Sequence, residues 1–370
     1  MFRNAVKVAR LFGINVEIDI SWFIVFFLFS FTLAGNYFPQ QIPGLAETVY
    51  WLLGFGVTIL FFVSVLVHEL SHSLVAIKEG IPIKTITLFI FGGVAQLQEE
   101  PKNPTAELRI TVAGPLASLG MAALFGLAYL LAPAGQPLTE GLAFLARINL
   151  IVAVFNLIPA FPLDGGRIMR AFLWRRWDNL LRATKIAVTT GSFLAFFVMA
   201  LGFLSLFQGS AWGLWYIILG WIIFQAGQRS YGQVAMQDIL SGIKIAEVMS
   251  EDVKVVPADH TIEELVSMFY RHKFGAFPII EDNNLKGLVT MNQVKDVEQR
   301  KWAFTRVREI MTPLKDCIIM KPGDEAVEAM MKMASKGEGR VLVIEDGELA
   351  GILSNTDMMR LINMKNVFGR

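Results

Sequence analysis

The first residues in the chain that could perform chemistry together are His68, Glu69 and His72, in the stretch His-Glu-Leu-Ser-His. On a helix, residues four apart face the same way, so both imidazoles can reach one metal ion. The carboxylate between them can then take a proton from a water that the metal activates. The chain has only four histidines, and these two lie in a long apolar run, where polar side chains are costly and functional by default. The spacing predicts a hydrolytic metal site with Glu69 as general base.

A catalytic zinc usually has three protein ligands and one open position, so a third ligand is expected. In residues 156–166, two prolines break a helix near Ile158 and a glycine pair permits a sharp turn after Asp164. At ~1.5 Å per helical residue, His68 and Ile158 both lie ~25 Å from the outer ends of their apolar runs. The stretch that holds Asp164 can therefore lie level with the two histidines, which supports a shared site.

The elements that position these residues follow from the distribution of hydrophobic side chains. Of the 370 residues, 54% are hydrophobic, above the 45–50% of soluble domains. The apolar runs extend over residues 20–224, which predicts a membrane domain at 1–236 and a soluble domain at 237–370. The net charge of +1 gives no reason to expect nucleic acid as a partner. Cys317 is the only cysteine, which excludes an intrachain disulfide and is typical of a buried strand residue.

Six apolar runs approach the ~20 residues that cross a bilayer, the last of them marginally. The predicted spans are Ile20–Phe38, Tyr50–Ile77, Leu108–Leu131, Gly141–Ile158, Ile186–Phe207 and Ala211–Ala226. The segments after the first, third and fifth spans contain no Lys or Arg, whereas the other flanking segments contain many. These basic residues are Arg3, Lys7, Arg10, Lys78, Lys84, Lys102, Arg167, Arg170, Arg175, Arg176 and Arg182. Their alternation predicts a multi-pass cell-membrane protein with both termini and the soluble domain in the cytoplasm. Arg147, inside the fourth span, either reaches the outer interface or has a buried functional role.

The two motifs together resemble the site-2 protease family of intramembrane zinc metalloproteases. The resemblance covers the membrane half and implies that His68, His72 and Asp164 bind one zinc ion, with Glu69 as general base. It also implies that Asn156 helps to hold the substrate backbone or the oxyanion. Many relatives read Gly-Pro-x-x-Asn on the third span, whereas this chain has Ser118 after Gly114-Pro115, so that position receives no role. The expected partners are the lipid bilayer and a transmembrane protein substrate.

Residues 84–93 are rich in β-branched and aromatic side chains and end in a glycine pair, which predicts a strand directly after the metal-binding helix. A helical substrate hides its peptide bonds, so a protease must hold it unwound. An edge strand that pairs with the substrate would do this. A purely structural hairpin at the membrane interface is the alternative.

The soluble half contains an internal repeat with matched segments in two units. Glu247-Val248-Met249-Ser250 corresponds to Glu309-Ile310-Met311-Thr312, and Gly287 to Gly351. The repeat resembles a tandem CBS pair, with units at about 243–300 and 305–365. The expected fold class is therefore a polytopic α-helical membrane protein, with about six spans and a short membrane-associated β segment, joined to a cytosolic α/β CBS pair.

The CBS resemblance implies that an adenine nucleotide (ATP, ADP or AMP) binds as a regulator and that the pair can form a homodimer. Ser354 and Asp357 match the family's nucleotide-contacting pair, and Thr290 is the counterpart of Ser354 in the first repeat. Gln293 stands where the first repeat would need an Asp. Because only residues 227–241 join the last span to the repeat, nucleotide binding is expected to control access to the metal site. His260 and His272 have no partner cluster and are expected to be solvated.

Two alternatives remain at this point. A channel or transporter with the same cytosolic module has no need of a hydrolytic metal site. A catalytically inactive receptor has no need of the carboxylate at Glu69.

Overall fold

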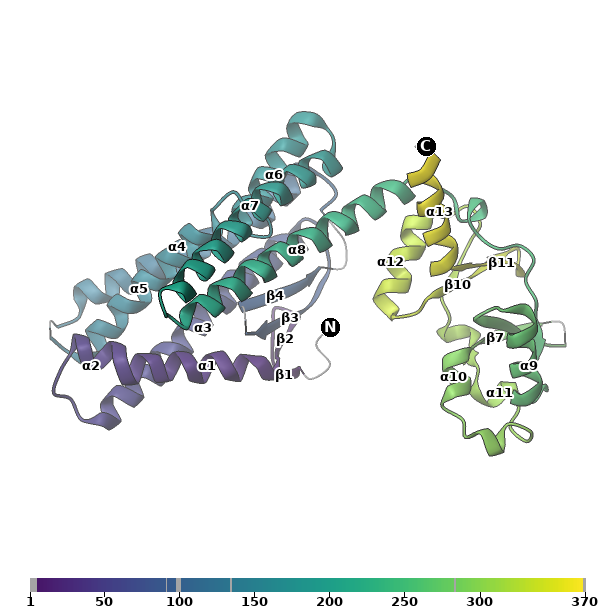
Figure 1. Cartoon of the computed structure of the whole chain (residues 1–370), viewed down its shortest axis with the longest axis horizontal. Coiled ribbons are helices and arrows are strands. Elements are labelled where there is room, and N and C mark those ends of the chain that lie inside the picture. The colour runs from purple at the N-terminus through teal and green to yellow at the C-terminus, as the bar shows by residue number, and fades with distance from the viewer. Residues whose placement is uncertain (1–4, 91, 98–100, 134, 283, 369–370) are drawn as a thin grey trace. The chain divides into compact units, whose positions relative to one another are not determined.

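The structure is a computed structural model that describes residues 5–90, 92–97, 101–133, 135–282 and 284–368. It divides into two compact units, Met1–Val234 and Ala235–Arg370, which are described separately below (Figure 1). Arg3 and Phe91, which contributed to the predictions of topology and of the strand at 84–93, lie outside the described residues.

The first unit is built mainly from long helices. They are α1 (Ile20–Thr32), the π-helical turn Leu33–Tyr37, α2 (Phe38–Gln41), α3 (Glu47–Lys78), α4 (Pro104–Leu131), α5 (Pro137–Asn156), α6 (Asp164–Trp177), α7 (Leu180–Phe207) and α8 (Trp212–Leu240). Local capping explains two of their starts. The Asn103 side chain accepts a hydrogen bond from the Ala106 amide at 2.8 Å, and Pro104 occupies the first position of α4. Asn179 caps α7 in the same way, through the Arg182 amide at 2.7 Å.

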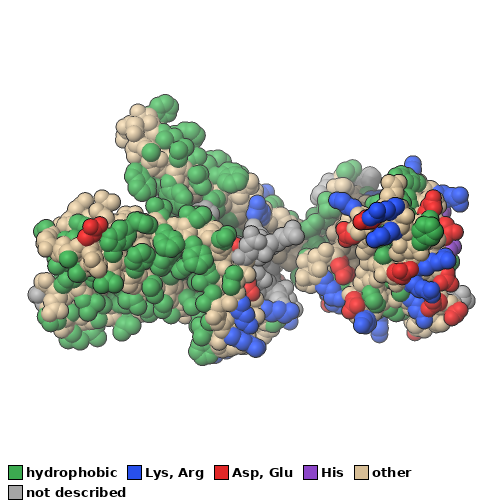
Figure 2. Space-filling model, turned by 90° about the horizontal axis from the view of Figure 1, so that it is seen from below, with side chains coloured by type: hydrophobic (Ala, Val, Ile, Leu, Met, Phe, Trp, Pro, Cys, Tyr) green, Lys and Arg blue, Asp and Glu red, His purple; other side chains and the backbone are tan. Residues whose placement is uncertain are grey.

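Within the described residues, five helical segments are long and apolar enough to cross a membrane. They are Ile20–Gln41, Glu47–Lys78, Pro104–Leu131, Pro137–Asn156 and Leu180–Phe207. All five begin or end several residues outside the predicted apolar run, because helices continue beyond the hydrocarbon with polar turns at their ends. The sixth predicted span, apart from its first residue, lies in α8, which does not meet the same criterion of length and hydropathy. Figure 2 shows hydrophobic side chains spread over the viewed face of this unit.

A four-stranded sheet accompanies the helices. Its strands are β1 (Val6–Leu11), β2 (Ile14–Ile18), β3 (Ile83–Phe89) and β4 (Gly92–Leu97), in the order β1-β2-β3-β4. β2 and β3 are parallel and the other pairs are antiparallel. A core of Ile14, Ala76, Ile81, Ile83, Ile86 and Ile110 joins the sheet to α3 and α4. The sheet is thereby placed against the helix that carries the His-Glu-Leu-Ser-His stretch.

The single strand predicted over residues 84–93 is two strands. β3 ends at Phe89, and the glycine pair opens β4 instead of closing β3. Gly92 has φ +123°, a backbone conformation that favours glycine, so it suits the start of the returning strand. β4 is consequently an edge strand of the sheet.

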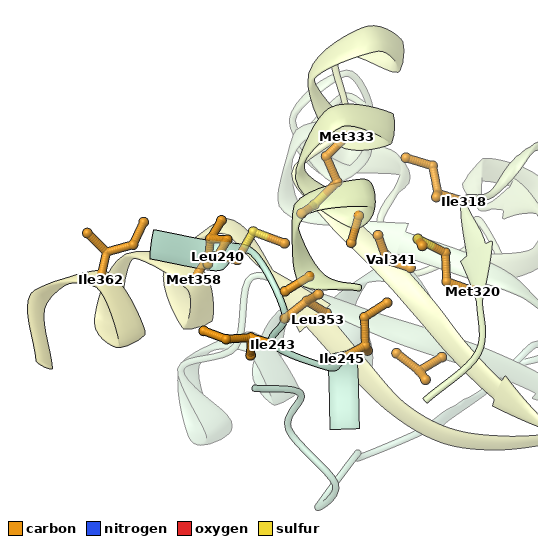
Figure 3. Close-up of a cluster of buried hydrophobic side chains, with 13 residues drawn as sticks. Leu240, Ile243, Ile245, Ile318, Met320, Met333, Val341, Leu353, Met358 and Ile362 are labelled. Atoms are coloured by element: carbon orange, nitrogen blue, oxygen red, sulfur yellow. The ribbon is translucent and has the colours of Figure 1, made fainter. Parts of the chain in front are cut away.

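The second unit contains two small sheets with helices. The first sheet has the order β5 (Val256–Pro257), β6 (Ala276–Glu281), β7 (Asn284–Thr290), β8 (Thr312–Pro313). The second has the order β11 (Glu348–Ser354), β10 (Arg340–Glu345), β9 (Ile319–Met320). The helices are α9 (Ile262–His272), α10 (Met291–Lys295), α11 (Val307–Ile310), α12 (Ala326–Lys336) and α13 (Asn355–Phe368). Figure 3 shows the core of the second repeat, in which Leu240 lies with Met333, Val341 and Leu353.

The two repeats exchange their first segments. β8 begins the second repeat but pairs with β7 of the first, and Ser250 of the first repeat bridges Ile352 of the second. This explains the repeated glycines, because a Cβ on Gly287 would lie 2.1 Å from the Thr312 carbonyl oxygen and one on Gly351 would lie 3.0 Å from that of Ser250. Each repeat therefore depends on the other for a complete sheet edge.

Candidate active site

Three donor atoms from two helices converge in the first unit. His68 and His72 lie one turn apart on α3, and their Nε2 atoms are 3.2 Å from one another. Asp164, the first residue of α6, places Oδ2 3.3 Å from each of these nitrogens. All three side chains are largely buried. The structure thus brings together the three residues that the sequence suggested for one metal ion, with ligand atoms within 4.8 Å of one another.

The hydrogen bonds around these side chains fit a bound cation. His72 Nδ1 donates to the Ile110 carbonyl oxygen at 2.7 Å, so the lone pair of its neutral ring lies on Nε2. His68 Nδ1 is 2.9 Å from Ser118 Oγ, which leaves its Nε2 facing Asp164. Asp164 Oδ2 is buried and, among the described residues, has no hydrogen-bond partner. Two imidazole nitrogens and one carboxylate oxygen are a donor set used by catalytic zinc sites.

One face of α4 supports the two imidazoles. Ile110, Gly114 and Ser118 follow one another at helical spacing, and each contacts the histidine pair. A Cβ on Gly114 would lie 2.1 Å from His72 Nε2 and 2.7 Å from His68 Nε2, so only glycine leaves room for the rings. Ser118 had no expected role. Its spacing of four residues from Gly114 could have indicated that Ser118 lies on the same face of the helix.

The chain around Asp164 differs from the sequence expectation. The glycine pair after Asp164 forms the first turn of α6 and makes no sharp turn. The two glycines instead allow close packing, because they have no side chain. A Cβ on Gly165 would lie 2.2 Å from the Leu157 carbonyl oxygen, and one on Gly166 would lie 2.2 Å from the Phe161 nitrogen. The loop that precedes α6 therefore folds directly onto the helix that presents Asp164.

A cavity of about 780 Å³ opens beside the three donor atoms. Glu69 and Asn156 line it together with the donors, and β4 contributes Gly92, Gly93 and Val94. The β4 backbone lies close to Glu69, because a Cβ on Gly93 would be 2.4 Å from Glu69 Cγ. The cavity therefore joins a metal-ligand set, a carboxylate and the edge strand of the sheet.

Two further polar side chains of the cavity wall were not identified from the sequence. Asn149 is 2% exposed and donates to the Leu145 carbonyl oxygen at 2.8 Å and to Ser64 Oγ at 3.3 Å. Asn149 lies on α5 and Ser64 on α3, one turn before His68. Buried polar groups of this kind are retained when they are hydrogen-bonded, as here.

Comparison with known proteins agrees with this geometry. The profile of Peptidase family M50 matches residues 56–140 and 132–201, and the CBS domain profile matches 245–299 and 307–363. Rip3 of Mycobacterium tuberculosis, named as a candidate zinc metalloprotease, is 34% identical over 369 residues, which cover 98% of this chain and 94% of that protein. The chain belongs to peptidase family M50.

Two relatives from Methanocaldococcus jannaschii extend the comparison. The zinc metalloprotease MJ0392 is 32% identical to this M50 peptidase, over 97% of this chain and 96% of its own length. A solved site-2 protease is 33% identical and covers 61% of this chain and 94% of that one, with a TM-score of 0.42. The protein is a metalloendopeptidase of the site-2 protease type, a membrane protein with a CBS pair. The channel or transporter alternative is thereby excluded.

In the CBS pair of this M50 peptidase, the two candidate nucleotide pairs differ in chemistry. Ser354 Oγ donates to Asp357 Oδ2 at 2.5 Å, and the other Asp357 oxygen lies 3.5 Å from Ser250 Oγ. At the equivalent place in the first repeat, Thr290 Oγ1 donates to Gln293 Oε1 at 3.1 Å. The Gln293 amide in turn donates to Thr312 at 2.8 Å. The second repeat therefore presents a carboxylate where the first presents a neutral amide.

The remaining histidines and Arg147 are placed as follows. In the described part of the chain, His260 and His272 belong to no metal-ligand cluster. Both histidines were expected to be solvated, whereas the structure has them half-buried. The His272 ring stacks on Phe274 with centroids 5.9 Å apart. Arg147 is exposed and donates to the Tyr37 hydroxyl.

Proposed function

We propose that this M50 peptidase hydrolyses peptide bonds of membrane-spanning proteins with one zinc ion held by His68, His72 and Asp164. The observation that carries the proposal is the convergence of three donor atoms within 4.8 Å, next to the carboxylate of Glu69 in one cavity. Bound zinc supplies Lewis acidity, which makes water nucleophilic near neutral pH and polarises a carbonyl. The test is cleavage of model transmembrane substrates by the purified full-length protein, with Glu69→Gln as the inactive control.

The proposed roles of the chain's own residues follow from their positions. Glu69 accepts the proton of the attacking water and later returns it to the leaving amine. Asn156, at the end of α5 and in the cavity wall, provides an amide for the substrate backbone or the oxyanion. Ser118 and the Ile110 carbonyl hold the two imidazoles in the orientation that presents Nε2.

We further propose that the substrate is held as an added strand along β4. β4 is an edge strand, and its first residues lie against Glu69. An extended segment paired there would present its peptide bonds to the carboxylate, which a helical segment cannot do. Photo-crosslinking from position 94 to a bound substrate tests the pairing. Absence of any adduct with a substrate that is cleaved would favour the structural hairpin.

The proposed topology is six spans, with residues 1–236 as the protease domain and both termini and the CBS pair (237–370) in the cytoplasm of a cell-membrane protein. A cysteine introduced at Gln136 or Gln208, both exposed, is expected to react with an impermeant thiol reagent from outside intact cells. One introduced at Asn179 is expected to react only after permeabilisation.

The native cysteine gives this labelling experiment a low background. Burial raises the pKa of the Cys317 thiol to about 11, so little reactive thiolate forms near neutral pH. The reverse labelling pattern would overturn the six-span topology. Labelling of Gln136→Cys from outside with no labelling of Gln208→Cys would place residue 208 on the cytoplasmic side and show that α7 and α8 do not form the fifth and sixth spans.

We propose that an adenine nucleotide regulates cleavage by binding the CBS pair, which also forms the contact of a homodimer. Such regulation requires a different affinity for two states of the enzyme. Asp357→Ala is expected to weaken nucleotide binding by about 1.5–3 kcal/mol, the range for a hydrogen bond to a charged group. It should also remove any effect of the nucleotide on cleavage.

Gln293→Ala, the matched change in the first repeat, is expected to leave affinity almost unchanged, because a neutral amide stands there in place of the carboxylate of Asp357. Titration of the full-length protein with ATP, ADP and AMP, followed by the cleavage assay with each, measures both effects. If no adenine nucleotide binds, the CBS pair is a docking or dimerisation module.

A further inference from the structure

A buried ion pair joins α4 to α6 outside the metal-ligand set. Arg170 on α6 is 2% exposed and Glu107 on α4 is 0% exposed. The Arg170 Nε donates to Glu107 Oε1 at 2.7 Å, and Nη2 donates to the same oxygen. Removing two charges from water costs several kcal/mol per ion, and the attraction between them often does no more than offset that cost. A buried ion pair therefore adds little net stability, so its presence here needs another explanation.

The position of the pair relates it to Asp164. α4 and α6 pack against one another. Glu107 precedes Gly114, which adjoins the two imidazoles, by seven residues, a rise of about 10.5 Å along the helix. Arg170 follows Asp164 by six residues, a rise of about 9 Å. On α4 the distance from the ion pair to the glycine beside the imidazoles, and on α6 the distance from the ion pair to Asp164, are therefore nearly equal lengths of helix.

Arg170 also contacts the loop that precedes Asp164. Its guanidinium carbon lies 5.4 Å from the centroid of the Phe161 ring. The Phe161 backbone is itself held tightly, because its amide donates to the Ala187 carbonyl oxygen at 3.2 Å. A Cβ on Gly191 would lie 1.8 Å from the Phe161 carbonyl oxygen. The Arg170 side chain thus links the helix that begins at Asp164 both to the loop before that residue and to α4.

We propose that Arg170 and Glu107 are positioning residues that set the register of α6 on α4 and so place Asp164 Oδ2 for zinc. The inference rests on the proposed function, in which Asp164 is a zinc ligand. A slip of α6 by one residue would move Asp164 by about 1.5 Å and turn its side chain by about 100°. Zinc–ligand distances tolerate only about 0.2 Å. Neither residue touches the proposed metal position, so both act through Asp164.

The test measures metal binding by the full-length protein in detergent. Arg170→Met and Glu107→Gln are expected to weaken zinc affinity by about 10–100-fold, the usual effect of losing a residue that supports a ligand. Affinity is read by competition with a chelator of known affinity. The visible spectrum of the cobalt-substituted protein should change as well, because it reports the ligand geometry. Arg170→Lys, which keeps the charge but loses the planar guanidinium, should give a smaller shift of both quantities.

Two controls separate positioning from general stabilisation. Arg109→Met removes an exposed ion pair of α4, in which Arg109 lies 3.0 Å from Glu79. It should leave zinc affinity and the cobalt spectrum unchanged. The double variant Glu107→Met/Arg170→Met removes both charges of the buried pair and should resist thermal unfolding better than either single variant. Arg167, whose Nε lies 3.9 Å from Glu107 Oε1, keeps its charge in all of these variants. The zinc affinity of the double variant should stay weak, because apolar side chains do not specify the register.

The outcomes distinguish the two proposals. If the unmodified protein binds zinc and the folded Arg170 and Glu107 variants bind it with equal affinity and the same cobalt spectrum, the positioning role is wrong. Recovery of full zinc affinity in the double variant would also overturn it, because the pair would then be only structural. If Arg170→Met fails to fold, the decision rests on Arg170→Lys and Glu107→Gln. A parent protein without zinc affinity would instead refute the proposed function.

Discussion

Glu69→Gln is expected to lower the rate of peptide hydrolysis by about 10²–10⁴-fold, the usual contribution of a general base, and to leave about one zinc ion bound per chain. Glutamine has nearly the shape of glutamate but cannot accept the proton of the attacking water. Glu69 lies in the cavity but is not one of the three converging ligand residues, so metal binding should persist. Cleavage of a model transmembrane substrate and zinc content per chain measure the two expectations on the same preparation.

Glu79→Gln is the matched control, because Glu79 follows directly after the same helix, pairs with Arg109 and is neither a converging ligand residue nor part of the described cavity wall. It should change neither quantity. His68→Ala and Asp164→Ala, in contrast, should lose zinc together with activity. Undiminished proteolysis by Glu69→Gln would exclude the proposed mechanism.

Gly114→Ala is expected to abolish cleavage and to weaken zinc affinity by more than about 100-fold, above the range for residues that only support a ligand. The added methyl group would lie 2.1 Å from His72 Nε2 and 2.7 Å from His68 Nε2. Both distances are shorter than any real carbon–nitrogen contact, so one or both rings must move away from Asp164. The effect is therefore direct displacement of two ligands, in the cavity where the substrate would also bind.

Gly120→Ala provides the control on the same helix, since a Cβ at Gly120 meets nothing within 4 Å. It should keep zinc affinity and cleavage, and alanine should favour the helix by about 0.5–1 kcal/mol. The measurements are chelator competition and the cleavage assay. Normal zinc affinity in Gly114→Ala would show that the imidazoles bind metal in a different arrangement.

Much of the fold was predictable because it depends on local patterns. Apolar runs of about 20 residues select membrane helices wherever they occur, and the structure has helices at all six predicted positions, five of them long and apolar enough to cross a membrane. The helix ends were less accurate because polar capping turns carry no hydrophobic signal. The glycine pairs were misread because glycine serves both turns and close packing. At 165 and 166 it is the backbone of the loop before α6 that requires the absence of a side chain.

For the candidate site, too, the features that depend on local patterns were predictable and those that depend on packing were not. The candidate catalytic side chains could be read from the sequence, because an imidazole pair at helical spacing with a carboxylate between them has few other uses. The repeat was recognisable from its matched segments. The contacts that hold those side chains are visible only in the folded chain. Ser118, Gly114 and the Glu107–Arg170 pair act across interfaces between helices. Which faces meet depends on how all the helices pack together. One residue of register changes every such contact, and no local pattern along the chain records that register.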